Sequence, residues 1–249
     1  MMASITLASG CELEEGGALV HVFSTHHATP ENGVFPDRGT EDMPRVFDND
    51  LGWEITLVNS YVTTVGMTMY RCDGTPLELN MFWGPCPEDL HLRDLERLTV
   101  AGLKASPGRY CGLEVTYGPY ELPSEEDDDP LVRHATPKNT EMVGSTIYMR
   151  GGARMGDGDY IPFELRFRDE VSVELDLSEL DGVDSPMKVN HKENFPKELT
   201  VSKTYDRFFD GIDFENFDQA ALEASLGDIL AVETRVSKGS LVDRDEPQR

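Results

Sequence analysis

The stretch that decides the fold is W-E-I-T-L-V-N-S-Y-V-T-T-V-G-M-T-M-Y, residues Trp53 to Tyr70. It consists largely of β-branched, aromatic and other apolar residues, which favour extended backbone. Trp53, Ile55 and Leu57 alternate with polar residues, the period-2 pattern of a strand that buries one face. The stretch therefore predicts either two consecutive strands or one long bent strand.

Extended runs and turn signals continue on both sides of this stretch. Asp73-Gly74, directly after it, is a strong short-range hairpin signal. The other runs with strand character cover residues 19–25, 77–81, 98–100, 109–117, 145–150, 161–168, 171–177 and 199–208. Strands at this spacing, separated by turn residues, predict an all-β protein, an antiparallel β-sandwich with long loops, rather than an α/β fold.

One α-helix is expected near the end of the chain. Asp218 is a favourable N-cap residue, and the apolar residues that follow form a single stripe at helical spacing. The residues of this stripe are Leu222, Leu226, Ile229 and Leu230. We therefore predict one sandwich domain over residues 19–236, with a tether over residues 1–18 and a charged tail over residues 237–249.

The net charge of the chain argues against some classes of binding partner. The chain has 249 residues, with 22 Lys and Arg against 47 Asp and Glu, and a formal net charge of −25. A net charge of this sign and size repels phosphate backbones and anionic lipid headgroups, so no nucleic-acid partner is expected. No run of 18 apolar residues occurs, so no membrane-spanning helix is expected either.

The N-terminal sequence carries a localisation signal. Residues 5–11, I-T-L-A-S-G-C, resemble the end of a bacterial lipoprotein signal, in which small residues precede a cysteine that becomes lipidated. This predicts a lipid on Cys11, with E-L-E-E-G-G as a solvated tether, and a place in the bacterial cell envelope, in the periplasm or anchored to the outer membrane. A chance match remains the alternative, because residues 1–10 contain no Lys or Arg.

The chain contains four cysteines, at positions 11, 72, 86 and 111. If Cys11 carries lipid, at most one disulfide can form among the remaining three. Cys72 and Cys86 flank the turn and the strand that follow Asp73-Gly74, so we predict that they form the disulfide across this hairpin. Cys111 alternates in phase with the apolar residues after it and is expected to be buried as a small apolar residue.

A six-residue motif occurs twice. Residues 27–32 read H-A-T-P-E-N and residues 134–139 read H-A-T-P-K-N, and the copies lie in the two long loops, 25–50 and 121–142. One interpretation is a turn motif used twice, with its Asn capping a backbone turn and its His exposed. The alternative is a metal site, since loops at one end of a sandwich can bring His27 and His134 together.

Imidazole is the most common transition-metal ligand, and further histidines accompany the first copy. His26 precedes His27 directly, and His21 lies on the same face as His27 if this strand is extended. The sequence therefore predicts a metal site drawn from His21, His26, His27 and His134.

Catalytic motifs are scarce. The sequence has no G-x-S-x-G, no H-E-x-x-H, no G-x-x-x-x-G-K and no G-x-G-x-x-G after a strand. Carboxylate pairs are too frequent in so acidic a chain to indicate a general acid and base. A hydrolase is therefore the weakest of three classes of function, behind a metal-binding protein and a metal-free interaction domain. The acidic run at residues 125–129 is interpreted as a solvated stretch, with a calcium site as the alternative. We therefore expect a protein that is not an enzyme.

Four segments follow one another along the chain in a distinctive order. They are a long strand pair ending in a turn (53–74), a Pro-Gly-x-Tyr strand (107–117), a Gly-rich hairpin (148–167) and R-F-F-D-G-I-D-F (207–214) before a terminal helix. This order resembles the MbnP-like family, bacterial periplasmic or surface copper-binding proteins. The resemblance implies a β-sandwich whose copper site is similar to two His and a Trp oxidised to kynurenine. Here that Trp would be Trp53 or Trp83, and Tyr148 and Met149 stand where the family has a Trp-rich segment.

The sequence thus predicts a non-enzymatic metal-binding envelope lipoprotein with copper as its ion. A metal-free envelope interaction domain is the alternative.

Overall fold

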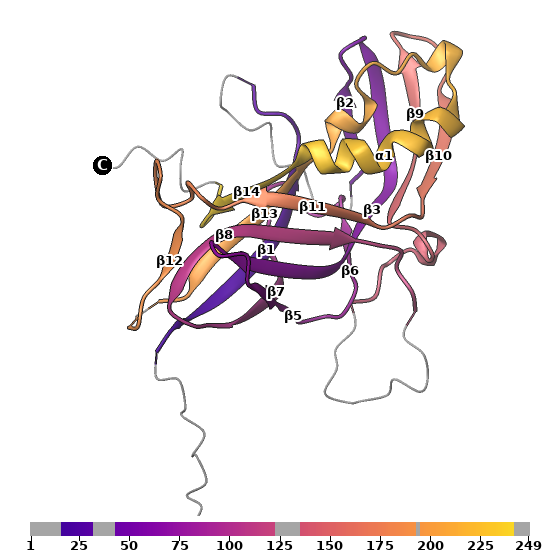
Figure 1. Cartoon of the computed structure of the whole chain (residues 1–249). Helices are drawn as coiled ribbons and strands as arrows, with labels where there is room; N and C mark the ends of the chain where they lie inside the picture. Colours follow the sequence, from indigo (N-terminus) through magenta and orange to yellow (C-terminus); the bar gives the residue numbers. More distant parts are fainter. Residues whose placement is uncertain (1–15, 32–42, 123–134, 193–194, 242–249) are drawn as a thin grey trace, which may run out of the picture.

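The computed structural model describes residues 16–31, 43–122, 135–192 and 195–241 (Figure 1). In these ranges the chain forms two β-sheets, together with short 3-10 turns and the α-helix α1 (Gln219–Glu233). The predicted all-β sandwich with one C-terminal helix is confirmed.

The smaller sheet has the strand order β14-β13-β1-β7-β5. Its strands are β14 (Thr234–Lys238), β13 (Lys197–Thr204), β1 (Ala18–His27), β7 (Leu98–Ala105) and β5 (Asn80–Met81). Its pairings are antiparallel apart from β1 with β13, which are parallel. A parallel pair needs a long crossover connection, and here most of the chain separates the two strands.

The larger sheet is centred on the order β10-β9-β3-β8-β11. These strands are β10 (Ile161–Phe167), β9 (Ile147–Met155), β3 (Trp53–Arg71), β8 (Gly108–Tyr117) and β11 (Val171–Asp176). The short strands β2 (Arg45–Asp48), β4 (Pro76–Glu78) and β6 (Cys86–Asp89) pair with β3, and β12 (Met187–Val189) pairs with β8.

The predicted long segment is the single bent strand β3. Its register shifts between Leu57 and Asn59 and between Thr64 and Gly66, and such irregularities bend a strand and increase its twist. It pairs with β2 and β9 along its first half and with β8 along its second half. β3 therefore connects the upper and lower parts of the larger sheet in Figure 1.

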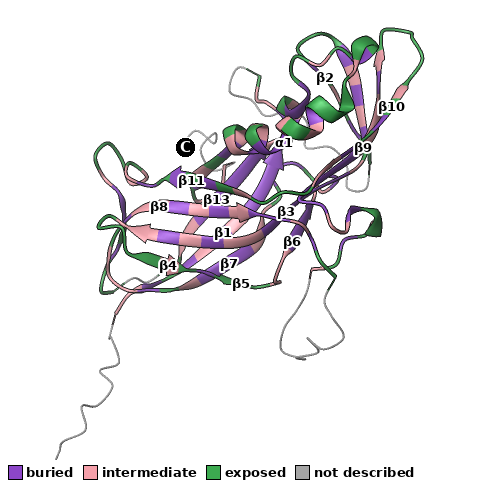
Figure 2. Ribbon diagram, turned by 45° about the vertical axis from the view of Figure 1, so that its right-hand side comes forward, coloured by how far each residue is buried: buried purple, intermediate pink, exposed green. Residues whose placement is uncertain are grey.

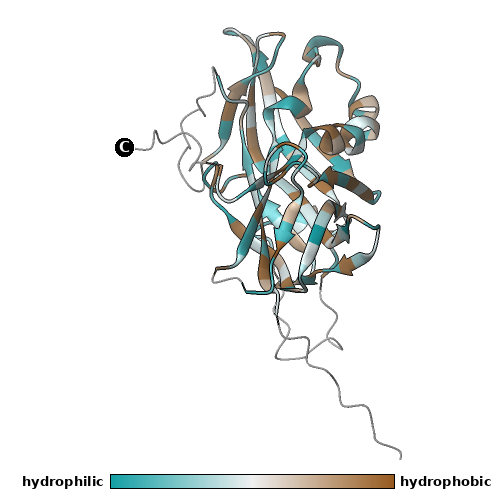
Figure 3. Ribbon diagram, turned by 60° about the vertical axis from the view of Figure 1, so that its left-hand side comes forward, coloured by the Kyte–Doolittle hydropathy of each residue, from teal (hydrophilic) through white to brown (hydrophobic). Residues whose placement is uncertain are grey.

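The core lies between the two sheets. Val20 and Val22 of β1 and Leu113 and Val115 of β8 are among its buried residues. Figure 2 shows buried residues concentrated in the strands of both sheets, with exposed residues mainly in the turns. In Figure 3 hydrophobic and hydrophilic residues alternate along the strands, as expected where each strand buries one face.

Helix α1 confirms the predicted N-cap and apolar stripe. The Asp218 carboxylate accepts a hydrogen bond from the Ala221 amide at 3.1 Å. Leu222, Leu226 and Leu230 are buried. Gly227 allows a close approach to the larger sheet, since a Cβ there would lie 2.7 Å from the Phe167 ring.

The predicted hairpin forms, but its second strand divides between the sheets. The Gly74 amide donates to the Arg71 carbonyl, and β4 pairs with β3. The chain then crosses at the buried Leu79, and β5 pairs with β7 in the other sheet. Near the C-terminus, the predicted run 199–208 ends as a strand at Thr204, and β14 extends to Lys238, past Val236.

The predicted disulfide between Cys72 and Cys86 is wrong, because the structure joins Cys72 to Cys111, with a Cα–Cα distance of 4.8 Å. Cys72 follows the end of β3, and its amide donates to Arg109 of the neighbouring β8. The register between β3 and β8 shifts beside Cys111, which takes Cys111 off the buried face. Cys86 is a free thiol in β6, buried on the inner face.

Within the described ranges, no helix combines the length and the apolar composition needed to cross a membrane.

We expect the Cys72→Ala/Cys111→Ala variant to lose about 4 kcal/mol of unfolding free energy, because the disulfide closes a loop of about 40 residues. Cys86→Ala is the control that leaves the disulfide in place. Urea unfolding of the oxidised proteins measures both. A reductant should lower the stability of the wild type and leave the double variant unchanged; equal stability of the wild type with and without reductant would contradict the assignment.

Candidate functional site

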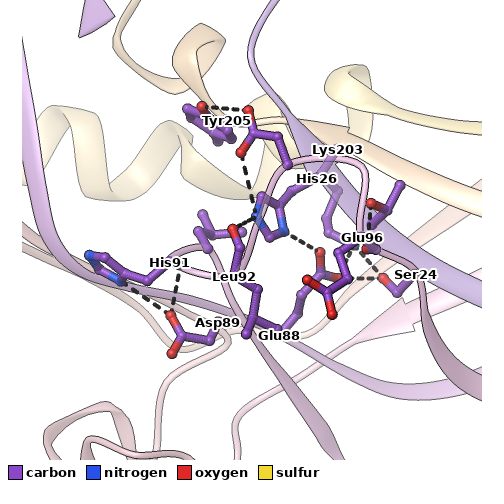
Figure 4. Close-up of polar contacts among 12 residues, drawn as sticks. Ser24, His26, Glu88, Asp89, His91, Leu92, Glu96, Lys203 and Tyr205 are labelled. Carbon is purple, nitrogen blue, oxygen red and sulfur yellow. Dashed lines mark hydrogen bonds and ion pairs between the residues drawn. The ribbon is translucent and has the colours of Figure 1, made fainter. Parts of the chain in front are cut away.

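A set of charged and polar side chains is enclosed between the two sheets. It comprises Ser24 and His26 of β1, Arg45 of β2, Glu88 of β6, Lys203 of β13, and Asp94 and Tyr205 from the connecting segments. We call this set the buried polar cluster, and Figure 4 shows its main contacts. All of its members are buried, so their charges and hydrogen bonds have to be satisfied within the protein.

Glu88 is the centre of the cluster. One carboxylate oxygen lies 2.6 Å from the Lys203 ammonium and accepts a hydrogen bond from the Ser24 hydroxyl, which in turn accepts one from Lys203. Burial by itself raises the pKa of Glu88, but Lys203 and His26 outweigh it, so the pKa falls to about 2. The pKa of Lys203 lies above its ordinary value, because Glu88 outweighs the opposing effect of burial.

His26 is held at both ring nitrogens. Nδ1 lies 2.9 Å from Glu88 Oε1, and Nε2 lies 3.0 Å from the carbonyl oxygen of Leu92. Each ring nitrogen therefore lies against a protein oxygen, and the His26 side chain is 1% exposed, so neither nitrogen is open to a metal ion in this arrangement.

Asp94 forms the second half of the cluster. Its Oδ2 accepts hydrogen bonds from the Tyr205 hydroxyl at 2.9 Å and from the Ala28 amide at 3.3 Å. Its Oδ1 lies 3.5 Å from Arg45 Nε and 3.8 Å from His26 Nε2. Burial raises the pKa of Asp94 above its ordinary value, against the lowering effects of His26 and Arg45.

The cluster is a structural ion network rather than a site open to a substrate. Glu88 is 2% exposed and Lys203 is 1% exposed, so a substrate would reach them only if the two sheets separated. The neighbouring Cys86 does not act as a nucleophile in this setting, because burial and then the charge of Glu88 raise the pKa of its thiol to about 12.

His21 is too far from His27 to share a metal ion with it. Both belong to the extended strand β1, and six residues of strand span roughly 20 Å. The His21 ring instead packs against Phe23 and Phe82, with centroids 6.4 and 6.2 Å away. Extension of β1 is what the prediction assumed, but the same extension separates the two rings along the strand.

His27 differs from His26 in its surroundings. Its Nδ1 lies 2.8 Å from the Ala28 carbonyl oxygen, so Nδ1 carries the proton and Nε2 is the basic nitrogen. Burial lowers its pKa, against the raising effects of the Ala28 carbonyl, Asp94 and Asp206. A lowered pKa keeps the ring neutral at neutral pH, which is the form that binds metal ions.

The second copy of the motif is described from Ala135 onward, and His134 lies outside the described residues. The Ala135 amide donates to the Trp83 carbonyl, and the Trp83 indole donates to the Thr99 carbonyl at 2.9 Å. Asn139 caps the 3-10 turn η2 (Thr140–Met142) by accepting from the Glu141 amide. The second copy thus has the Asn-capped turn that the alternative interpretation predicts.

Several other predicted positions can now be placed. Trp53 is buried, with its ring centroid 5.5 Å from that of Phe214, whereas Trp83 is partly exposed. Cys11 and the acidic run at residues 125–129 lie outside the described residues. Among the residues that the structure does describe, no three His, Cys, Asp or Glu side chains form a group suited to a metal ion.

Sequence reasoning missed Glu88, Asp94 and Lys203. A signal for Lys203 was present, because it continues the alternation of Leu199 and Val201 and so falls on the buried face of β13. A buried Lys requires a buried acid, but the sequence does not indicate which of the 47 acidic residues supplies it.

We expect Lys203→Met to lower the unfolding free energy by about 3–5 kcal/mol, because it leaves the Glu88 carboxylate buried without its ammonium partner. Lys203→Met/Glu88→Gln should be more stable than Lys203→Met alone, since it removes that carboxylate charge. Lys104→Met, at an exposed position of β7, should change stability by less than about 0.5 kcal/mol. Urea unfolding measures all three; a cost for Lys203→Met similar to that for Lys104→Met would contradict the role of the pair.

Known proteins offer one structural likeness to report. No protein-family model and no curated protein matches the sequence. Among solved structures, the chain is similar to MbnP from Methylosinus trichosporium, with a TM-score of 0.44 and 9% identity over 89% of this chain and 99% of that one. The match agrees with the resemblance seen in the order of segments, and it concerns the course of the backbone alone.

Proposed function

We propose that the protein binds a transition-metal ion, copper in the first instance, with His27 and His134 supplying imidazole ligands. The observation that carries the proposal is the contact between His27 Nδ1 and the Ala28 carbonyl at 2.8 Å. Metal-binding histidines commonly donate the other ring N–H to a carbonyl or carboxylate, which fixes the tautomer and the orientation of the ring.

The electrostatic surroundings of His27 suit a cation. Asp94 and Asp206 both interact favourably with positive charge at this ring. Asp206 is held close to the motif, since its carboxylate accepts a hydrogen bond from the Thr29 amide at 3.0 Å. Imidazole is a ligand for copper, zinc, nickel and iron, and the choice of copper rests on the family resemblance of the sequence.

The structure reduces the ligand set that the sequence suggested. His26 is engaged at both ring nitrogens, and His21 lies roughly 20 Å along β1 from His27. Neither is included in the proposed site, which leaves the two histidines of the duplicated motif.

A metal-free envelope interaction domain is the second candidate. The Asn139 cap favours it, because capping gives the second copy of the motif a purely structural reason to exist. The two candidates differ in one measurable property, the affinity for copper that depends on the motif.

We propose further that Cys11 carries the lipid that holds the chain in the cell envelope. The support is the segment I-T-L-A-S-G-C at residues 5–11.

We expect His27→Gln and His134→Gln each to weaken copper binding at least about tenfold, because each removes a ligand from a shared ion. Isothermal titration calorimetry with copper measures the affinity. His191→Gln is the matched control, since His191 is exposed and belongs to no duplicated motif, and it should leave the affinity unchanged.

Thermal unfolding without metal separates folding defects from ligand loss, because His27 is buried. The proposal is refuted if the wild type and the His27 and His134 variants bind copper equally. The metal-free interaction domain would then be the better interpretation.

If Cys11 is lipidated, the protein isolated from its native membrane should begin at Cys11 and carry an acyl mass, because processing removes the residues before the modified cysteine. Intact-mass spectrometry of the membrane fraction tests this. Cys11→Ser should move the protein out of that fraction. A native chain that starts at Met1 and lacks the added mass would end the lipoprotein hypothesis.

A further inference from the structure

The peptide unit that joins Ala28 to Thr29 is engaged on both sides. Its carbonyl oxygen, that of Ala28, lies 2.8 Å from His27 Nδ1, and its N–H, that of Thr29, donates to Asp206 Oδ1 at 3.0 Å. The peptide unit is a rigid trans plane, so its C=O and its N–H point to opposite sides. The plane therefore links the His27 ring to the Asp206 carboxylate, and we call this line of hydrogen bonds the carboxylate–peptide relay.

The hydrogen bond to Asp206 determines which way the plane faces. The N–H and the C=O of one peptide unit rotate together, so an N–H fixed on Asp206 also fixes the Ala28 carbonyl oxygen. A rotation that moved this carbonyl away from His27 Nδ1 would break the bond between Thr29 and Asp206. Hydrogen bonds to an ionised acceptor are roughly twice as strong as those between neutral groups. Asp206 therefore holds in place the acceptor to which Nδ1 donates.

The preceding peptide unit, which joins His27 to Ala28, is held as well. Its carbonyl oxygen accepts a hydrogen bond from the Tyr205 amide at 3.1 Å, and its N–H donates to Asp94 Oδ2 at 3.3 Å. The Tyr205 hydroxyl donates to the same Asp94 oxygen at 2.9 Å. The backbone on the other side of Ala28 is thus fixed at both of its polar groups, which leaves Asp206 to fix the plane that contacts the ring.

The topology of the smaller sheet brings Asp206 to this position. β1 and β13 run parallel and pair as far as His27 and Thr204. The two segments leave the sheet side by side, which brings Asp206, two residues beyond Thr204, to Thr29, two residues beyond His27. Asp206 is also the first residue of the 3-10 turn η3 (Asp206–Phe209), so its own backbone belongs to a regular element.

A carboxylate behind a histidine has a defined effect on metal binding. Such a carboxylate commonly accepts the ring N–H directly, which fixes the tautomer and raises the basicity of the other ring nitrogen. Here a peptide unit stands between the two groups, and hydrogen bonds in a chain polarise one another, so the charge of Asp206 strengthens the bond at His27 Nδ1. Burial lowers the pKa of His27, and the Ala28 carbonyl and Asp206 act in the opposite direction.

We infer that Asp206 is a positioning residue of the proposed metal site. Through the peptide unit between Ala28 and Thr29, it fixes the His27 ring with the proton on Nδ1 and the lone pair for the metal ion on Nε2. The inference rests on the proposed function for its metal ion, whereas the carboxylate–peptide relay is a property of the metal-free protein.

The first test measures the tautomer of His27 in the full chain without metal. Long-range proton–nitrogen NMR spectra of protein with ¹⁵N-labelled histidine distinguish a proton on Nδ1 from one on Nε2, and His27→Gln assigns the signal. We expect the proton on Nδ1 in the wild type and exchange between the two tautomers in Asp206→Ala. Asp206→Asn should retain the wild-type tautomer, because its side-chain oxygen can still accept from the Thr29 amide.

Two matched controls isolate the hydrogen bond. Thr29→Ala keeps the amide but removes the hydroxyl, which accepts from Arg207 Nε at 2.8 Å. Asp213→Ala removes a carboxylate of the same charge, which accepts from the Glu215 amide at 3.1 Å at the start of the 3-10 turn η4 (Phe214–Asn216). Both controls should retain the wild-type tautomer of His27. Thermal unfolding verifies that each variant is folded.

The second test is the copper affinity of the same proteins, measured by isothermal titration calorimetry. Asp206→Ala should weaken copper binding about tenfold, the lower end of the losses found when a residue behind a metal ligand is removed. Asp206→Asn should bind copper more tightly than Asp206→Ala, and Asp213→Ala should bind it like the wild type.

Three outcomes would overturn the inference. They are an unchanged His27 tautomer in Asp206→Ala, an equal change in Asp213→Ala, and equal copper affinities of these two variants where the wild type binds copper through His27. If the wild type and His27→Gln bind copper equally, the proposed function fails instead. The tautomer in the metal-free protein then decides alone whether Asp206 positions the ring.

Discussion

The ion pair between Glu88 and Lys203 is the interaction on which the arrangement of the two sheets depends. Glu88 belongs to β6 of the larger sheet, and Lys203 belongs to β13 of the smaller one. A shift of either strand by one residue would move its charged group to the opposite face and leave the partner buried without an opposite charge. The hydrophobic core favours contact between the sheets, whereas this pair favours one particular register of that contact.

Local signals in the sequence were sufficient for much of the fold. The alternation in β3, the Asp73-Gly74 turn and the Asp218 cap each depend on residues close together in the chain. The disulfide was not predictable in this way, because it depends on β8 lying beside β3 and on a register irregularity next to Cys111. Sequence alternation placed Cys111 on the buried face, and one extra residue in the strand reversed that.

In the candidate site, too, local sequence indicates some features and distant residues determine the others. The sequence identified His26 and His27 as unusual, but their different environments arise from distant residues. Glu88, 62 positions from His26 in the sequence, engages one side of its ring and makes it part of a structural ion network. His27 instead donates its hydrogen bond to the carbonyl oxygen of a neighbouring residue, Ala28, and it retains a neutral ring. Adjacent residues of one strand point to opposite faces, which explains why one ring joins the buried polar cluster and the other does not.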